Sequence, residues 1–76
     1  MGVLSNISGK EAVKIFQKIG YYLDRQEGSH MILYNDTPGY PLLSIQNHKE
    51  LAPGLLSAQI KRAKLTVEEF IALRKK

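Results

Sequence analysis

Turn-forming residues divide the middle of this chain into short extended segments, and this division constrains the fold more than any other feature. Gly20 is expected to end a preceding helix in a left-handed conformation. Gly28 and Ser29 form the next turn, and residues 36–39 combine a capping Asp, a Pro that presets φ and a permissive Gly. Pro41 cannot donate a ladder hydrogen bond, so we expect it at a strand start or edge. Alternating apolar and aromatic residues predict three strands, at residues 21–26, 30–35 and 40–45.

Two capping boxes and a proline mark the starts of three helices. In the first box, Ser8 should accept a hydrogen bond from the Glu11 backbone N–H, and the Glu11 side chain should reach back to Ser8. Thr66 and Glu69 repeat this pattern, and Pro53 suits the first turn of a helix between the two boxes. The expected apolar faces are Ala12, Ile15, Phe16 and Ile19, then Leu56, Ile60 and Ala63, then Phe70, Ile71 and Leu73.

These elements predict one α+β domain over residues 1–76, with the order helix, three-stranded antiparallel sheet, helix, short helix. Helices on one face of such a meander would leave the other face open. The absence of cysteine excludes disulfides and thiolate metal sites. No apolar stretch is long enough to cross a bilayer, and the first residues lack the features of a signal peptide. We therefore expect a cytoplasmic protein that does not engage membranes.

The chain is basic, with 11 Lys and Arg residues against 7 Asp and Glu residues. Such an excess favours anionic partners such as nucleic acid. An excess that serves solubility alone is about as common in small proteins, so charge by itself leaves both interpretations open.

His30 is the strongest candidate for chemistry. It directly follows the Gly28-Ser29 turn, where backbone N–H groups and a hydroxyl could meet a phosphate. RNA cleavage needs a base for the 2′-OH, an acid for the leaving oxygen and positive charge near the phosphate, and it needs no metal. An imidazole exchanges protons near neutral pH. The alternative is an ordinary strand histidine. His30 also alternates with Ile32 and Tyr34, so either the strand begins irregularly or this face of the sheet is mixed.

Several other residues could contact RNA. His48 lies in a polar loop and could touch substrate, although two histidines alone make a poor metal site. Lys10 and Lys14 share a helical stripe with Lys18 that could follow a phosphate backbone or could be only a solvated face. Lys49 lies near a helix N-terminus, which favours phosphate. Four tyrosines could stack on bases, although at least two are expected in the core or at a strand edge: Tyr21, Tyr22, Tyr34 and Tyr40.

From Ser8 to Phe70 the chain resembles the HicA (YcfA-like) toxin family. The R-Q-x-G-S-H string that ends at His30 is the most specific part of the resemblance. The remaining segments corroborate its order and spacing: Ser8-Gly9-Lys10-Glu11, Gly20-Tyr21, His48-Lys49-Glu50-Leu51, Pro53-Gly54 and Ala63-Lys64-Leu65-Thr66-Val67-Glu68-Glu69-Phe70.

The resemblance implies a fold similar to double-stranded-RNA-binding domains. It implies an mRNA interferase of a type II toxin–antitoxin system, with a HicB antitoxin that blocks the active site. We expect no cofactor, and no DNA binding by this chain alone. The histidine of the G-S-H string, His30, would be catalytic. The expected RNA-binding residues are Lys10, Lys14, Gly28, Ser29, His48 and Lys49. The alternatives are a non-catalytic RNA-binding module with the same fold and a protein-interaction domain.

Five positions depart from the pattern of the family. Met31 stands where a second histidine is frequent, and Gln46 stands where proline is common. Leu55 and Ser57 replace the usual Thr and Arg. Lys64 stands where glycine is common, and a positive φ there would cost Lys about 1 kcal/mol relative to Gly.

Overall fold

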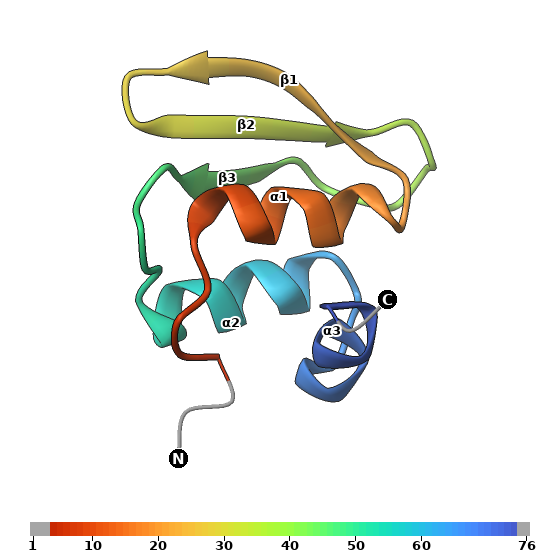
Figure 1. Cartoon of the computed structure of the whole chain (residues 1–76). Coiled ribbons are helices and arrows are strands. Elements are labelled where there is room, and N and C mark those ends of the chain that lie inside the picture. Colours follow the sequence, from red (N-terminus) through yellow and green to blue (C-terminus); the bar gives the residue numbers. More distant parts are fainter. Residues whose placement is uncertain (1–3, 75–76) are drawn as a thin grey trace.

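Three helices and one antiparallel sheet make up the structure, a computed structural model that describes residues 4–74. The sheet has the strand order β1-β2-β3. The predicted α+β class and element order are confirmed, and the layout is that of double-stranded-RNA-binding domains (Figure 1). The elements are α1 (Gly9–Gln17), β1 (Tyr21–Glu27), β2 (His30–Asn35), β3 (Leu43–Gln46), α2 (Pro53–Arg62) and α3 (Val67–Arg74).

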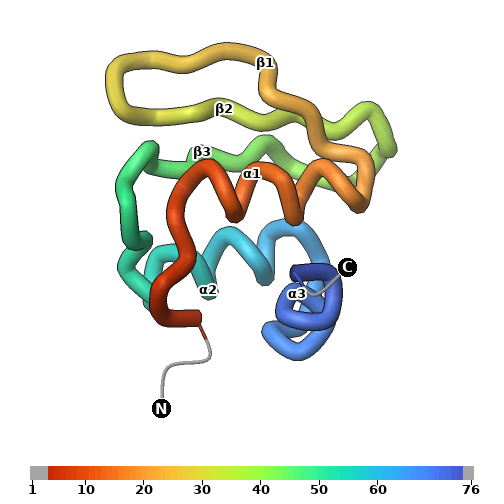
Figure 2. Tube along the Cα trace, in the orientation of Figure 1, coloured from red at the N-terminus to blue at the C-terminus, as the bar shows by residue number. Residues whose placement is uncertain are grey.

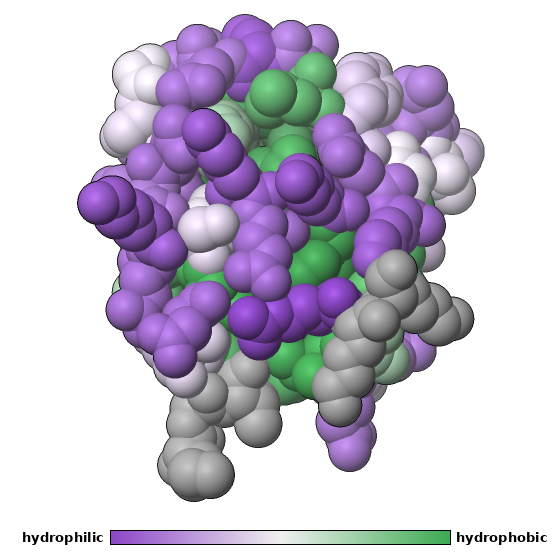
Figure 3. Space-filling view, in the orientation of Figure 1, coloured by the Kyte–Doolittle hydropathy of each residue, from purple (hydrophilic) through white to green (hydrophobic). Residues whose placement is uncertain are grey.

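The hydrophobic core lies between one face of the sheet and the helices. α1 contacts β1 and β3, α2 contacts β3, and α3 contacts both other helices. Phe16 of α1 and Phe70 of α3 are fully buried, with ring centroids 5.2 Å apart. On the face shown in the space-filling view, polar side chains cover most of the surface and apolar surface shows between them (Figure 3). The predicted apolar faces of α1 and α2 supply much of this core: Ala12, Ile15, Phe16, Leu56, Ile60 and Ala63.

The opposite face of the sheet mixes polar and apolar side chains. Along β2, Met31 and Leu33 belong to the core, so the alternating residues lie on the other face. Ile32 is only 8% exposed, yet it lies outside the core cluster and pairs with Arg25 and Ser44 on the neighbouring strands. This open face is therefore mixed, one of the two possibilities that the alternation of His30 with Ile32 and Tyr34 left open. His30 lies on this face.

The third strand is shorter than predicted, because residues 40–42 are not part of the ladder. Pro41 has no N–H to donate, and its carbonyl accepts a hydrogen bond from the Tyr21 hydroxyl (2.8 Å). Tyr40 packs edge-on against Tyr21, with centroids 6.1 Å apart. These two contacts of the Tyr21 side chain keep residues 40–42 in a loop outside the ladder. β1 also contains an unpredicted β-bulge between Leu23 and Arg25.

The helix ends follow the predicted chemistry with one exception. The backbone N–H of Glu11 donates to Ser8 Oγ (3.0 Å), but the Glu11 carboxylate pairs with Arg74 Nε (2.6 Å) and not with Ser8. The reach-back half of the first capping box was therefore wrong, because a cation from α3 outcompetes a backbone N–H. Both bonds of the second box form: the Glu69 N–H donates to Thr66 Oγ1 (3.0 Å), and the Thr66 N–H donates to Glu69 Oε1 (2.9 Å). Gly20 has the expected positive φ (102°), two residues beyond the capping residue of α1.

Lys64, between α2 and α3, has a φ of 62°, as its position in the family pattern suggested. We expect Lys64→Gly to raise the free energy of unfolding by about 0.5–1 kcal/mol, because glycine adopts this conformation without strain. Part of that gain is offset, since Lys64 Nζ lies 5.2 Å from the centroid of the Tyr40 ring. Urea unfolding measures the effect, with Lys64→Ala as the control that removes the ammonium and keeps a Cβ. A glycine variant no more stable than the alanine variant would contradict this prediction.

Candidate functional site

His30 is the first residue of β2 and its side chain is exposed. It pairs with Glu27 of β1 and with Gln46 of β3, so it lies in the middle strand at one end of the sheet. Gly28 has a φ of 60°, and a Cβ built on it would meet no atom within 4 Å. The turn before His30 therefore needs glycine for its backbone conformation, and the space above it is open to solvent.

Backbone hydrogen bonds join three segments next to His30. The Asn47 N–H donates to the carbonyl of Ser29 (2.6 Å), which ties the β3–α2 loop to the β1–β2 turn. The Gly9 N–H donates to the carbonyl of His48 (2.9 Å), which ties the start of α1 to the same loop. In the tube view, this loop, the β1–β2 turn and the start of α1 lie at one end of the molecule (Figure 2).

The predicted site residues are thus brought to adjoining segments. Ser29 and His30 lie on the turn and on β2, and His48 and Lys49 lie on the β3–α2 loop. Lys10 is in the first turn of α1. Lys14 lies one turn further along α1 and is exposed as well.

The close approach of α1 to this loop depends on Gly9. Gly9 is buried, and a Cβ built on it would collide with the carbonyl oxygen of Gln46. The α-carbon of Asn47 is also too near to leave room. Only glycine allows the helix N-terminus to contact the loop so closely, and the sequence contained no signal of this requirement.

Ser44 of β3 lies within hydrogen-bond distance of one nitrogen of the His30 imidazole, the candidate catalytic group. Its Oγ lies 3.3 Å from His30 Nδ1, and the tautomer of the ring decides which atom donates. Within residues 4–74, Nε2 has no hydrogen-bond partner, so this nitrogen remains for a substrate. Sequence reasoning missed Ser44, because only the register of β2 against β3 brings it beside His30.

A pocket of about 220 Å³ adjoins His30 between β3 and α2. Leu55 forms an exposed apolar wall, and the Gln59 side chain accepts a hydrogen bond from the Ser44 N–H through Oε1 (3.4 Å). Among residues 4–74, no Lys, Arg, Asp or Glu side chain lines it. Its lining is His30, Ser44, Ile45, Gln46, Leu51, Leu55, Leu56 and Gln59.

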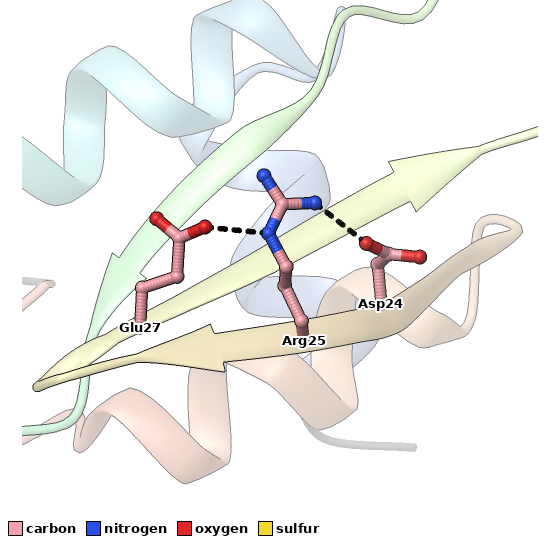
Figure 4. Close-up of polar contacts among 3 residues, drawn as sticks. All are labelled: Asp24, Arg25 and Glu27. Atoms are coloured by element: carbon pink, nitrogen blue, oxygen red, sulfur yellow. Dashed lines mark hydrogen bonds and ion pairs between the residues drawn. The ribbon is translucent and has the colours of Figure 1, made fainter.

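Arg25, in the string that ends at His30, is compensated by two carboxylates. Its Nη1 lies 2.8 Å from Asp24 Oδ2, and its Nε lies 2.6 Å from Glu27 Oε2 (Figure 4). The hydrogen bond to Glu27, followed by those to Asp24 and Tyr34, raises the pKa of the Arg25 guanidinium. A phosphate would have to displace these partners, so Arg25 is a poor candidate for a phosphate contact.

Lys10, Lys14 and Lys49 are exposed, and none forms an ion pair within residues 4–74. Lys18, the third member of the stripe, instead donates to the carbonyl of Leu73 (2.7 Å) and joins α1 to α3. The basic stripe of α1 is therefore shorter than the spacing alone indicated.

The tyrosines divide between the two faces of the sheet. Tyr21 is buried in the core, where burial, followed by the nearby Tyr40, raises the pKa of its hydroxyl. Tyr40 packs against the same core, so two of the four tyrosines are structural, as expected. Tyr22 and Tyr34 pair across β1 and β2 on the open face.

Fold and site together define a small α+β domain of the double-stranded-RNA-binding type with an exposed histidine at the end of its sheet. A family described as the HicA toxin of bacterial toxin–antitoxin systems matches residues 9–65. The chain belongs to the HicA toxin family. Comparison with curated proteins and with solved structures found no significant match.

Residues 4–74 contain neither a membrane-spanning helix nor a grouped set of metal ligands. No helix there is both long enough and apolar enough to span a bilayer. No three His, Asp or Glu side chains in that range are grouped so that they could hold a metal ion.

Proposed function

We propose that this HicA family member is a cytoplasmic ribonuclease toxin that cleaves mRNA through His30 without a metal. The observation that carries the proposal is the exposed imidazole beside the Gly28-Ser29 turn, with Nδ1 engaged by Ser44 and with no partner for Nε2 among the described residues. Such a ring is oriented and accessible at the same time, which general acid–base catalysis requires.

The reaction uses the 2′-OH of the RNA itself. The 2′ oxygen attacks the adjacent phosphorus, a P–O2′ bond forms and the P–O5′ bond breaks. One proton leaves the 2′ oxygen and one proton joins the departing 5′ oxygen. His30 transfers one of these protons through Nε2, and water exchanges the other. His48, the other imidazole of the chain, is carried on the adjoining loop and contacts the RNA.

Binding of the RNA depends on backbone groups at this end of the sheet and on exposed lysines of α1 and of the β3–α2 loop. Gly28 leaves the space above the turn open, and the Ser29 hydroxyl lies at the same turn. Lys10, Lys14 and Lys49 supply exposed positive charge that no carboxylate among the described residues neutralises.

Incubation of the purified protein with a long mRNA in EDTA tests the proposal. Cleavage that survives EDTA is expected from a metal-independent histidine mechanism. Binding without fragments would instead support the second candidate, a non-catalytic RNA-binding module that uses the same basic surface. The net charge of +4 is compatible with both, so only the fragments discriminate between them.

We also propose that a HicB-like antitoxin inhibits the toxin by covering this end of the sheet. The uncompensated lysines predict acidic residues on the surface of the partner. Co-expression with a HicB-like protein encoded by a neighbouring reading frame should give a copurifying complex that cleaves no RNA. An antitoxin-bound protein that still cleaves RNA would contradict this inhibition.

Ser44→Ala should lower kcat about fivefold, with KM for RNA little changed. The substitution removes a hydrogen bond of about 1 kcal/mol that orients the His30 ring. Single-turnover cleavage of one defined RNA measures the effect. Ser44→Thr keeps the hydroxyl and should restore the rate, so a threonine variant as slow as the alanine variant would exclude this orienting role.

A further inference from the structure

The pocket between β3 and α2 is a feature that acid–base chemistry at His30 does not use. We propose that it binds the nucleobase of a nucleotide next to the cleaved phosphate, an inference that rests on the proposed ribonuclease function. His30 is part of its lining, so an occupant of the pocket lies directly beside the reacting group.

The lining of the pocket fits a base and not a phosphate. None of the described residues that line it is a Lys, Arg, Asp or Glu. Leu51 and Leu56 are buried, and Leu55 is 57% exposed at the wall. Apolar walls with a few polar groups are typical of sites for uncharged ring ligands. The phosphates would remain outside, near the exposed lysines.

The polar groups of the pocket can discriminate between bases. Gln59 Oε1 accepts from the Ser44 N–H, and this bond directs its amide nitrogen away from that contact. The NH₂ group of Gln59 has no acceptor within residues 4–74, so it can donate to an acceptor on the edge of a base. All four RNA bases offer a ring nitrogen or a carbonyl oxygen as an acceptor, but at different positions on the base edge, so the NH₂ group of Gln59 can bind some bases better than others.

A protein segment is the competing occupant, because β3 is an edge strand. The nucleobase is favoured by the position of His30 in the lining and by the size of the cavity, about 220 Å³. A base is joined directly to the ribose whose 2′-OH reacts, so a base in this pocket positions that ribose near the imidazole.

The direct experiment is a methyl NMR titration with AMP, CMP, GMP and UMP. At least one nucleotide should shift the methyl signals of Leu55 and Leu56 and leave those of Leu23 unchanged. Leu23 is the matched control, because it is a leucine 44% exposed on β1, outside the pocket. Shifts that spare Leu55 and Leu56 with all four nucleotides would overturn the proposal.

The second measurement is kcat/KM for cleavage of a set of RNAs. These RNAs carry each base in turn at the positions that flank the cleaved bond. Leu55→Glu should lower kcat/KM about tenfold, whereas Leu23→Glu should stay within about twofold of wild type. Gln59→Leu should change the base preference and still permit cleavage.

Equal activity of the two glutamate variants would overturn the proposal. Loss of antitoxin copurification by Leu55→Glu with full cleavage would assign the pocket to a protein partner and overturn it as well. If the wild type cleaves no RNA, the proposed ribonuclease function fails, and the NMR titration still decides whether the pocket binds a base.

Discussion

His30→Ala should reduce RNA cleavage to a trace and relieve the growth arrest expected when this protein is expressed. A single general acid–base histidine contributes about 10²–10⁴-fold to a rate, so the remaining activity should be at least a hundredfold lower. The side chain is exposed and lies outside the core, so its truncation should leave the circular dichroism spectrum unchanged. Cleavage of a defined RNA by purified protein, measured over time, gives the rate.

Two further variants separate proton transfer from binding. His30→Gln retains polar groups but transfers no proton near neutral pH, so it should be as inactive as His30→Ala. His48→Ala should weaken RNA binding more than it slows the chemical step, because His48 lies on the loop beside the site. Full activity of either His30 variant would exclude the proposed mechanism.

Gly9→Ala should lower the free energy of unfolding by about 2–3 kcal/mol, a large loss for a domain of this size. The added methyl group would collide with the carbonyl oxygen of Gln46, and both groups belong to the backbone. Relief requires α1 to move away from β3, which breaks the hydrogen bond from the Gly9 N–H to His48 O. Urea unfolding monitored by circular dichroism measures the loss.

Gly54→Ala is the matched control for that substitution. Gly54 is in the first turn of α2, it is exposed, and an added Cβ there would meet no atom within 4 Å. Alanine is the better helix former, so this variant should be neutral or more stable by up to about 1 kcal/mol. If Gly9→Ala proves as stable as Gly54→Ala, the close packing of α1 on Gln46 is excluded.

Much of the fold could be predicted because its signals are local. The Ser8 cap, the reciprocal Thr66 and Glu69 bonds and the positive φ of Gly20 each involve residues within a few positions of one another. The bounds of β2 were predicted correctly, since turn residues flank it on both sides. The resemblance to the HicA family also came from a contiguous string, and the family match confirms it.

Predictions failed where a distant residue competes with a local one. Glu11 was expected to bond Ser8, three residues away, but Arg74, 63 residues away, takes its carboxylate. Tyr40 and Pro41 have strand-like neighbours in sequence, but Tyr21 holds them out of the ladder. Local propensity is worth a fraction of a kcal/mol per residue, so a tertiary contact readily overrides it.

The sequence by itself determined the order of the elements, the turn before His30 and the identity of the imidazole as the candidate catalytic group. The tertiary structure alone decided what surrounds that imidazole. Ser44 reaches Nδ1 and Gln59 reaches Ser44 only because β2, β3 and α2 pack in one particular register. That register is set by the shared core of the helices and the sheet, whose contacts join residues far apart in the chain.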